Sequence, residues 1–167
     1  MQDDVVFTTV RALAADPLAA AAPLADDAGC VFVRPDSPLK PFSGRVVPLS
    51  ELTAAALDHG FYYDDLDLRI VVSRTQSLGE EWRVVVCDGG VVTGCRYEAQ
   101  GRQALDAGLP VGVRSLAATI AAELPSPERV YGLDLVQTEA GLRLLELNPF
   151  SGMDLYACDL GAIVAAM

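Results

Sequence analysis

Two carboxylates and an amide recur close together near the C-terminal end of the sequence. Asp134 interrupts one apolar run, and Glu146 and Asn148 interrupt the next. A three-residue loop at 139–141, with Gly141 in the left-handed region, would pair Asp134 with Glu146 and leave Asn148 on the same face. Oxygen ligands of this kind suit Mg²⁺ that also binds substrate phosphates. The alternative is a polar strip on the solvent face of an amphipathic hairpin.

A second hairpin is predicted where Asp-Gly separates two β-branched runs, at residues 88–89. With a two-residue loop, Glu81 would face Arg96, and Arg83 would lie on the same face opposite Gly94. Two arginines and a glutamate beside a glycine would form a wall that binds an anion, since the guanidinium fork suits phosphate and carboxylate. The alternative is an ordinary salt bridge between Glu81 and Arg96, worth under about 1 kcal/mol if exposed.

A third cluster of charge lies around a proline-rich loop at residues 35–44. Arg34 ends an apolar strand before this loop, and Lys40 lies within it. Two cations on such a loop could hold phosphates. The sequence contains neither the phosphate-binding G-x-x-x-x-G-K-[ST] motif nor the dinucleotide-binding G-x-G-x-x-G motif, so those two kinds of nucleotide site are unsupported.

The elements that must position these residues are short strands with few helices between them. Strands are expected at residues 30–34, 45–47, 67–73, 81–87, 90–97, 129–136 and 142–148, and helices at 51–57 and 113–124. Because the order contains no regular βαβ units, the expected fold class is α+β. Residues 1–29 are interpreted as a strand–helix entry or a connector to a main domain at residues 30–167.

Composition sets the outer limits. The 167 residues are 51% hydrophobic and 21% charged, which is typical of a globular protein of one domain or two small lobes. With 12 basic and 23 acidic residues, the net charge of −11 disfavours binding to nucleic acid. No apolar run approaches the roughly 20 residues that a membrane span needs. Four cysteines with a single histidine do not make a zinc site, and are expected to be buried thiols in a reducing cytoplasm.

Taken together, the motifs resemble the ATP-grasp superfamily, over roughly residues 30–160. They are Val31-Phe32-Val33-Arg34-Pro35, Lys40, Phe42-Ser43-Gly44, Glu81-Trp82-Arg83, Asp134 and Glu146-Leu147-Asn148-Pro149-Phe150. The similarity is greatest to a bacterial and phage clade in which Arg-Pro replaces the usual Lys-Pro on the first nucleotide-binding strand. The resemblance implies two α+β lobes, each with an antiparallel sheet, that enclose a nucleotide cleft.

The resemblance also implies which residues bind ATP and Mg²⁺. Asp134, Glu146 and Asn148 match the magnesium ligands of the family, and Arg34 and Lys40 match its phosphate-contacting cations.

Further positions follow from the same resemblance. Arg83 and Arg96 match the catalytic arginines on the phosphate and acceptor side, with Glu81 in the cofactor-binding set. Residues 72–74, which are Val72, Ser73 and Arg74, fall at the hinge whose backbone contacts adenine.

The implied reaction is ligation of a small-molecule or peptide carboxylate to an amine, or less often a thiol, through an acylphosphate that ATP supplies. In the family a preceding domain helps to bind the acceptor, whereas here only about thirty residues precede Val31. Residues 1–29 are therefore either a connector or a truncated preceding domain, and a homodimer is one way to complete the acceptor site. We expect the isolated chain to form product slowly. Two alternatives stay open: a module that binds Mg-ATP without complete catalysis, and an acidic α+β domain that binds no nucleotide.

Overall fold

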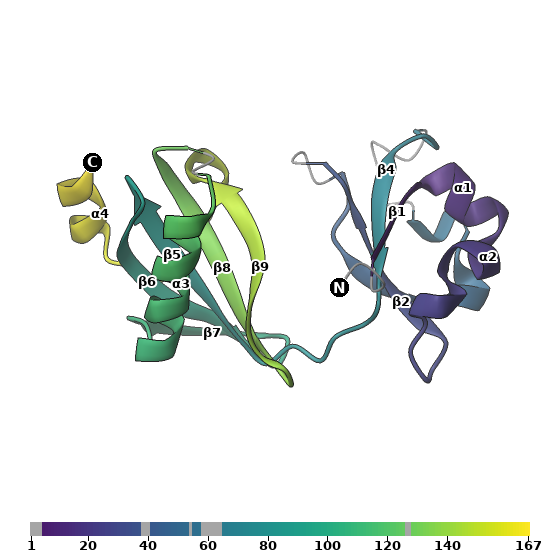
Figure 1. Cartoon of the computed structure of the whole chain (residues 1–167), viewed down its shortest axis with the longest axis horizontal. Helices are drawn as coiled ribbons and strands as arrows, with labels where there is room; N and C mark the ends of the chain where they lie inside the picture. The colour runs from purple at the N-terminus through teal and green to yellow at the C-terminus, as the bar shows by residue number, and fades with distance from the viewer. Residues whose placement is uncertain (1–4, 38–40, 54, 58–64, 126–127) are drawn as a thin grey trace. The chain divides into compact units, whose positions relative to one another are not determined.

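The computed structural model describes residues 5–37, 41–53, 55–57, 65–125 and 128–167. The chain divides into two compact units, Met1–Gln76 and Ser77–Met167. Each unit contains one antiparallel sheet with its own core (Figure 1). The α+β fold class is confirmed. None of the helices formed by the described residues is long and apolar enough to cross a membrane.

The first unit is a four-stranded sheet with short helices on one face (Figure 1). Its strands, in spatial order, are β1 (Val5–Thr9), β4 (Arg69–Ser73), β2 (Cys30–Pro35) and β3 (Arg45–Pro48), and its helices are α1 (Val10–Ala15), α2 (Pro17–Ala21) and the 3₁₀ turns η1 (Ala22–Leu24), η2 (Leu49–Glu51) and η3 (Ala55–Leu57). Thr9 caps α1 by accepting a bond from the Ala12 amide, and Asp16 caps α2 in the same way. Pro17 occupies the first position of α2, where it disrupts no hydrogen bond.

Residues 5–24 therefore form part of the first unit. Leu13 and Leu24 are fully buried in its core beside Val31 and Ile70. The predicted boundary between residues 29 and 30 does not separate two compact units. The predicted helix at 51–57 is also wrong: its place is taken by η2 and η3, because Leu52 leaves helical backbone angles (φ −71°, ψ 84°) and its side chain enters the core.

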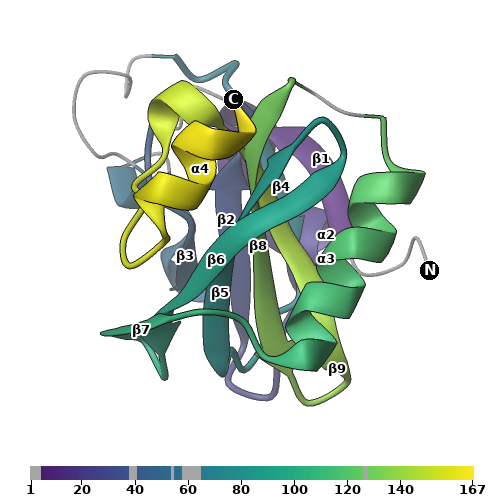
Figure 2. The same ribbon diagram turned by 90° about the vertical axis from the view of Figure 1, so that its left-hand side faces the viewer.

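The second unit is a five-stranded antiparallel sheet with a helix on each face (Figure 2). In spatial order the strands are β7 (Arg102–Ala107), β6 (Gly90–Ala99), β5 (Glu80–Cys87), β8 (Val130–Thr138) and β9 (Gly141–Pro149), and the helices are α3 (Val111–Glu123), α4 (Leu160–Ala166) and the 3₁₀ turn η4 (Phe150–Gly152). Successive residues of β5 point to opposite faces. Trp82, Val84 and Val86 pack against α3, whereas Val85 and Cys87 pack with Ile163 of α4.

The β8–β9 hairpin pairs Asp134 with Glu146, as predicted, although its turn is shorter than predicted. Thr138 pairs with Gly141, whose φ of 97° favours glycine, so the loop has two residues instead of three. A bulge beside Asp134 then inserts Leu145 into β9 and restores the predicted register.

The β5–β6 hairpin begins as predicted and then departs from the predicted register. Asp88 and Gly89 both have positive φ, and Cys87 pairs with Gly90. A bulge next to Val86 then shifts the pairing by one residue. Cys95 comes opposite Arg83 and Arg96 comes opposite Trp82, so the predicted pairing of Glu81 with Arg96 is wrong.

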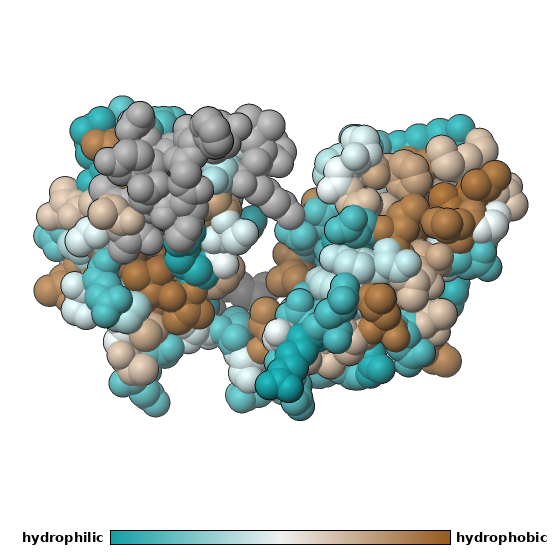
Figure 3. Space-filling view, turned by 180° about the vertical axis from the view of Figure 1, so that it is seen from behind, coloured by the Kyte–Doolittle hydropathy of each residue, from teal (hydrophilic) through white to brown (hydrophobic). Residues whose placement is uncertain are grey.

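Both units leave some large apolar side chains exposed, and each has brown, apolar surface in Figure 3. On β9 this group comprises Leu144, Leu145 and Leu147, with 37–40% of each side chain exposed. β9 is the edge strand of its sheet, and these leucines lie on the strand that also carries Glu146 and Asn148.

Candidate functional site

The second unit contains a buried ion pair at the centre of its sheet. Asp134 of β8 is completely buried, and Arg83 of the neighbouring β5 is 6% exposed. Arg83 Nε donates to Asp134 Oδ1 at 2.9 Å, and Nη2 donates to Oδ2 at 2.6 Å. The two residues lie directly opposite each other, so strand pairing fixes this two-pronged contact.

Arg83 is held from the other side as well. Its Nη1 donates to the carbonyl oxygen of Asp154 at 2.7 Å, and its guanidinium carbon lies 5.1 Å from the ring centre of Tyr156 and 5.5 Å from that of Tyr97. Burial alone would lower the pKa of Arg83, but the hydrogen bonds and charge of Asp134 outweigh it and raise that pKa. In this arrangement Arg83 orients Asp134.

Asn148 links the two carboxylates of the hairpin. Its Nδ2 donates to Asp134 Oδ2 and to Glu146 Oε1, both at 3.0 Å. Asp134, Glu146 and Asn148 therefore converge, as predicted from the alternation of β8 and β9. The electropositive amide group sits between two carboxylates, in a position that attracts positive charge.

This donor set fits a hard cation such as Mg²⁺. All three side chains offer oxygen, and a half-turn of the Asn148 amide would present Oδ1 in place of Nδ2. Within the described part of the chain, no group of three or more His, Cys, Asp and Glu side chains forms a metal site. The amide of Asn148 would therefore be needed as the third ligand, beside Asp134 and Glu146.

Glu81 adds negative charge to the same sheet face. Its side chain is 7% exposed, and Tyr97 Oη donates to its Oε2 at 2.5 Å. Burial raises the pKa of Glu81, and the charges of Glu98, Asp134 and Glu146 raise it further, against the opposing hydrogen bond from Tyr97. A bound cation would relieve this repulsion.

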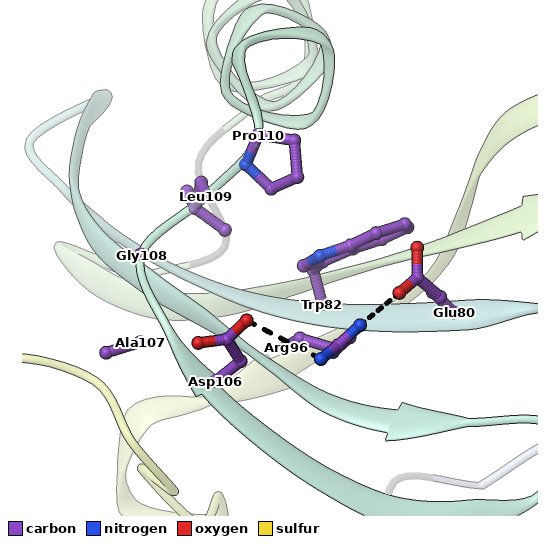
Figure 4. Close-up of a pocket in the computed structure, with 8 residues that line it drawn as sticks. All are labelled: Glu80, Trp82, Arg96, Asp106, Ala107, Gly108, Leu109 and Pro110. Carbon is purple, nitrogen blue, oxygen red and sulfur yellow. Dashed lines mark hydrogen bonds and ion pairs between the residues drawn. The ribbon is translucent and has the colours of Figure 1, made fainter.

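Arg96 lies on the other face of the sheet, in a pocket of about 340 Å³. Figure 4 shows its guanidinium between Glu80 and Asp106, with Trp82 and Pro110 above it. The Nη2–Oδ2 distance to Asp106 is 3.5 Å. The predicted wall that joins Arg83 and Arg96 is therefore wrong: the bulge in β6 turns the two arginines to opposite faces, and both are already paired with carboxylates.

In the first unit, Arg34 is an exposed residue of β2 between the buried Val33 and Pro35. Lys40 lies outside the described residues. Close to Arg34, Gly44 approaches the ring of Phe32 so closely that a Cβ there would lie 2.4 Å from Phe32 Cζ. This contact requires glycine and fixes the loop beside Arg34.

The three predicted hinge positions differ in what they can offer a ligand. Val72 is fully buried in the core and pairs with strands on both sides, so its side chain cannot contact a ligand. Ser73 ends β4, and its hydroxyl donates to the carbonyl oxygen of Arg74. Arg74 Nη2 donates to the carbonyl oxygen of Pro23 at 2.9 Å.

Three residues beside Arg83 were missed by sequence reasoning. Tyr97 and Tyr156 stack with ring centres 4.9 Å apart and an angle of 7° between their planes. Tyr156 has a φ of 47°, and Asp154 acts through its backbone oxygen. Tyr97 follows an apolar strand and could have been noticed, whereas neither a backbone contact nor a left-handed tyrosine leaves a signal in the sequence.

Comparison with known proteins gives one family and a set of solved structures. The model of an ATP-grasp domain, clade family 2, matches residues 5–166. No curated protein matches the chain significantly. The structure is similar to a D-alanine–D-alanine ligase from Bacillus anthracis (20% identity, TM-score 0.61, covering 98% of this chain and 56% of that one).

Two further similar structures are ligases or synthetases. One is the D-cycloserine synthetase DcsG (17% identity, TM-score 0.60, covering 97% of this chain and 62% of that one). The other is the ATP-grasp ligase PsnB in complex with a phosphomimetic variant of its minimal precursor, Mg and ADP (19% identity, TM-score 0.57, covering 97% of this chain and 52% of that one). At these identities the likeness concerns the fold, and the chain spans little more than half the length of these proteins.

Proposed function

Because the chain belongs to this clade family of the ATP-grasp domains, we propose that it is an ATP-dependent ligase or the ATP-binding part of one. In the proposed reaction a substrate carboxylate attacks the γ-phosphorus of ATP, and ADP leaves. An amine, or less often a thiol, then attacks the acylphosphate carbon and expels inorganic phosphate. The free thiols of the chain support a cytoplasmic location for this reaction.

The observation that carries this proposal is the convergence of Asp134, Glu146 and Asn148 on one face of the second sheet. We propose that these three residues hold Mg²⁺ through oxygen atoms. When bound, Mg²⁺ would neutralise charge on the transferring phosphoryl group. Glu81 contributes further negative charge near the cluster, which supports binding of a cation.

Arg83 has a positioning role in this proposal. Its fork orients both oxygens of Asp134, and the stacked Tyr97 and Tyr156 cover its guanidinium. It therefore differs from a free arginine that grips phosphate. Because Arg96 is on the opposite face, beside Glu80, we do not include it in the proposed phosphate site.

In the first unit we propose that Arg34 and Lys40 contact the phosphates of ATP. The exposure of Arg34 on β2 supports this role. Adenine would lie at residues 72–74, where only backbone atoms of Val72 are available and the side chains of Ser73 and Arg74 lie at the strand end. Phosphoryl transfer depends on such positioning more than on covalent catalysis by the protein.

For the substrates we propose an amino acid or a peptide. D-alanine–D-alanine ligase and PsnB, the latter with a precursor, are among the similar structures. Acceptor recognition varies with loops, so identity below 25% does not transfer a particular substrate.

The test is release of ADP from ATP and Mg²⁺ in the presence of paired acids and amines. Amino acids, dipeptides and small dicarboxylates are supplied as the acid, each with and without an amine, and ligated products are identified by mass spectrometry. The proposal expects ADP release that requires both partners and a product that has lost one water. Binding of Mg-ATP without turnover on any pair would identify a nucleotide-binding module, and absence of Mg-ATP binding would overturn the proposal.

A further inference from the structure

Two cysteines face each other in the second unit, away from the proposed ATP ligands. The Sγ atoms of Cys95 and Cys158 lie 3.4 Å apart. Cys95 is completely buried in β6, and Cys158 is 7% exposed in the segment between η4 and α4. Cys87, by contrast, directs its thiol to the carbonyl oxygen of Ala166, and Cys30 belongs to the first unit.

The geometry needs only a small movement to join the two sulfur atoms. A disulfide bond is about 2.05 Å long, so the thiols must approach each other by a little over an ångström. Cys95 is fixed by strand pairing opposite Arg83. Cys158 lies outside any helix or strand, in a turn closed by its own amide and the carbonyl oxygen of Leu155, so it can move without breaking the sheet.

We propose that Cys95 and Cys158 form a reversible disulfide, which makes the pair a redox-sensitive modification site beside the carboxylate cluster. The oxidant is a hydroperoxide, small enough to reach a buried thiol. Cys95 Sγ attacks one peroxide oxygen, the O–O bond breaks and one water leaves, giving a sulfenic acid. Cys158 Sγ then attacks this sulfur, the S–O bond breaks, and the departing hydroxide takes the Cys158 proton as a second water. Two electrons pass from the protein to each peroxide.

The hydrogen bond between the thiols favours this order of events. Cys158 lowers the pKa of Cys95 to about 7, against the opposing effect of burial. The same hydrogen bond, followed by burial, raises the pKa of Cys158. Cys95 is therefore the thiolate near neutral pH, and the thiolate is the reactive form.

The segment that carries Cys158 also holds Arg83. The carbonyl oxygen of Asp154 accepts from Arg83, and Tyr156 stacks on Tyr97 over the guanidinium. A disulfide at Cys158 would fasten residues 153–159 to the sheet. We therefore expect oxidation to stabilise the second unit and to slow amide hydrogen exchange in this segment.

The experiment maps disulfides in the full chain after treatment with hydrogen peroxide, with remaining thiols blocked before unfolding. Trypsin leaves Cys87 and Cys95 on one peptide, residues 84–96, and leaves Cys158 on residues 144–167. The proposal expects these two peptides to be joined, and to separate on reduction. Cys87→Ser should retain the joined pair, which identifies Cys95 as the partner, and Cys30→Ser should retain it as well.

Two results would overturn the proposal. One is that Cys95 and Cys158 both stay open to alkylation after oxidation and unfolding; the other is that Cys87→Ser abolishes the joined peptides. A second readout is the Tm of the wild-type chain, which should rise by a few degrees on oxidation and return on reduction. Cys158→Ser should lose both effects, and because the wild-type map is decisive alone, poor folding of that variant does not affect the test.

Discussion

Arg83→Lys separates the charge of Arg83 from its fork of hydrogen bonds. The guanidinium makes two bonds to Asp134, at 2.9 and 2.6 Å, and one to the Asp154 carbonyl oxygen at 2.7 Å. A lysine ammonium keeps the charge but cannot make the planar two-pronged contact. If two charge-assisted hydrogen bonds are lost at about 1.5–3 kcal/mol each, the free energy of unfolding should fall by about 3 kcal/mol or more. That is a large part of the roughly 5–15 kcal/mol that stabilises a typical domain.

The matched control is Arg96→Lys in the same hairpin. Arg96 also pairs with carboxylates, but its side chain is 31% exposed and that of Asp106 is 69% exposed, so the loss should be about 1 kcal/mol or less. Unfolding in urea is followed by the fluorescence of Trp82, the only tryptophan of the chain, which reports on the second unit. If Arg83→Lys destabilises this unit no more than Arg96→Lys does, at equal dependence on urea, the argument for a buried positioning pair is refuted.

Three further substitutions test other parts of the site. Arg34→Ala should weaken ATP binding by about tenfold or more, whereas Arg69→Ala, another exposed arginine of the first sheet, should leave titration calorimetry unchanged. Glu81→Gln should raise the Tm of the metal-free chain at pH 7, because burial raises the folded-state pKa of this carboxyl above its unfolded value. The ionised form is then a stability loss that grows as pH rises through the unfolded pKa of about 4.3, so the gain should vanish below that pH, and a gain independent of pH would contradict it. Asn148→Asp should lower the metal-free Tm by placing a third carboxylate beside two others, and added Mg²⁺ should restore it; a Tm insensitive to Mg²⁺ would count against the site.

The carboxylate cluster could be predicted because side chains alternate along a strand. Asp134 and Glu146 each interrupt an apolar run, and any register that buries the leucines brings the two acids to the same face. The turn was predicted one residue too long, and the bulge that inserts Leu145 compensated for that error. The prediction of the pair was therefore confirmed, although the turn behind it was wrong.

The arginine wall failed for the same physical reason. One inserted residue beside Val86 moves every later side chain of β6 to the other face, and nothing in the run of valines marks that insertion. Gly94 is the nearest sign of local crowding: a Cβ there would lie 2.7 Å from the Arg83 carbonyl oxygen and from Leu109. The sequence predicted this glycine as space for an anion, whereas the structure uses it for close packing.

The N-terminal residues were predictable in detail but not in role. Thr9, Asp16 and Pro17 are ordinary signals for the starts of two short helices. What could not be read from them is that β1 pairs with β4, some sixty residues away in the chain, and so joins the first sheet. Such long-range pairing depends on the whole fold and not on a local pattern.

The most direct measurement of the central claim is the thermal unfolding of the chain with ATP and Mg²⁺, compared with ATP and a chelator. At a hundredfold excess over Kd, Mg-ATP should stabilise the folded state by about 2.7 kcal/mol. Glu146→Gln should lose most of this gain while its stability without ligand stays close to wild type, and Glu139→Gln, in the exposed turn of the same hairpin, should keep the gain in full. An equal gain in the presence of chelator, or a full gain in Glu146→Gln, would contradict the assignment of Asp134, Glu146 and Asn148 as the magnesium site.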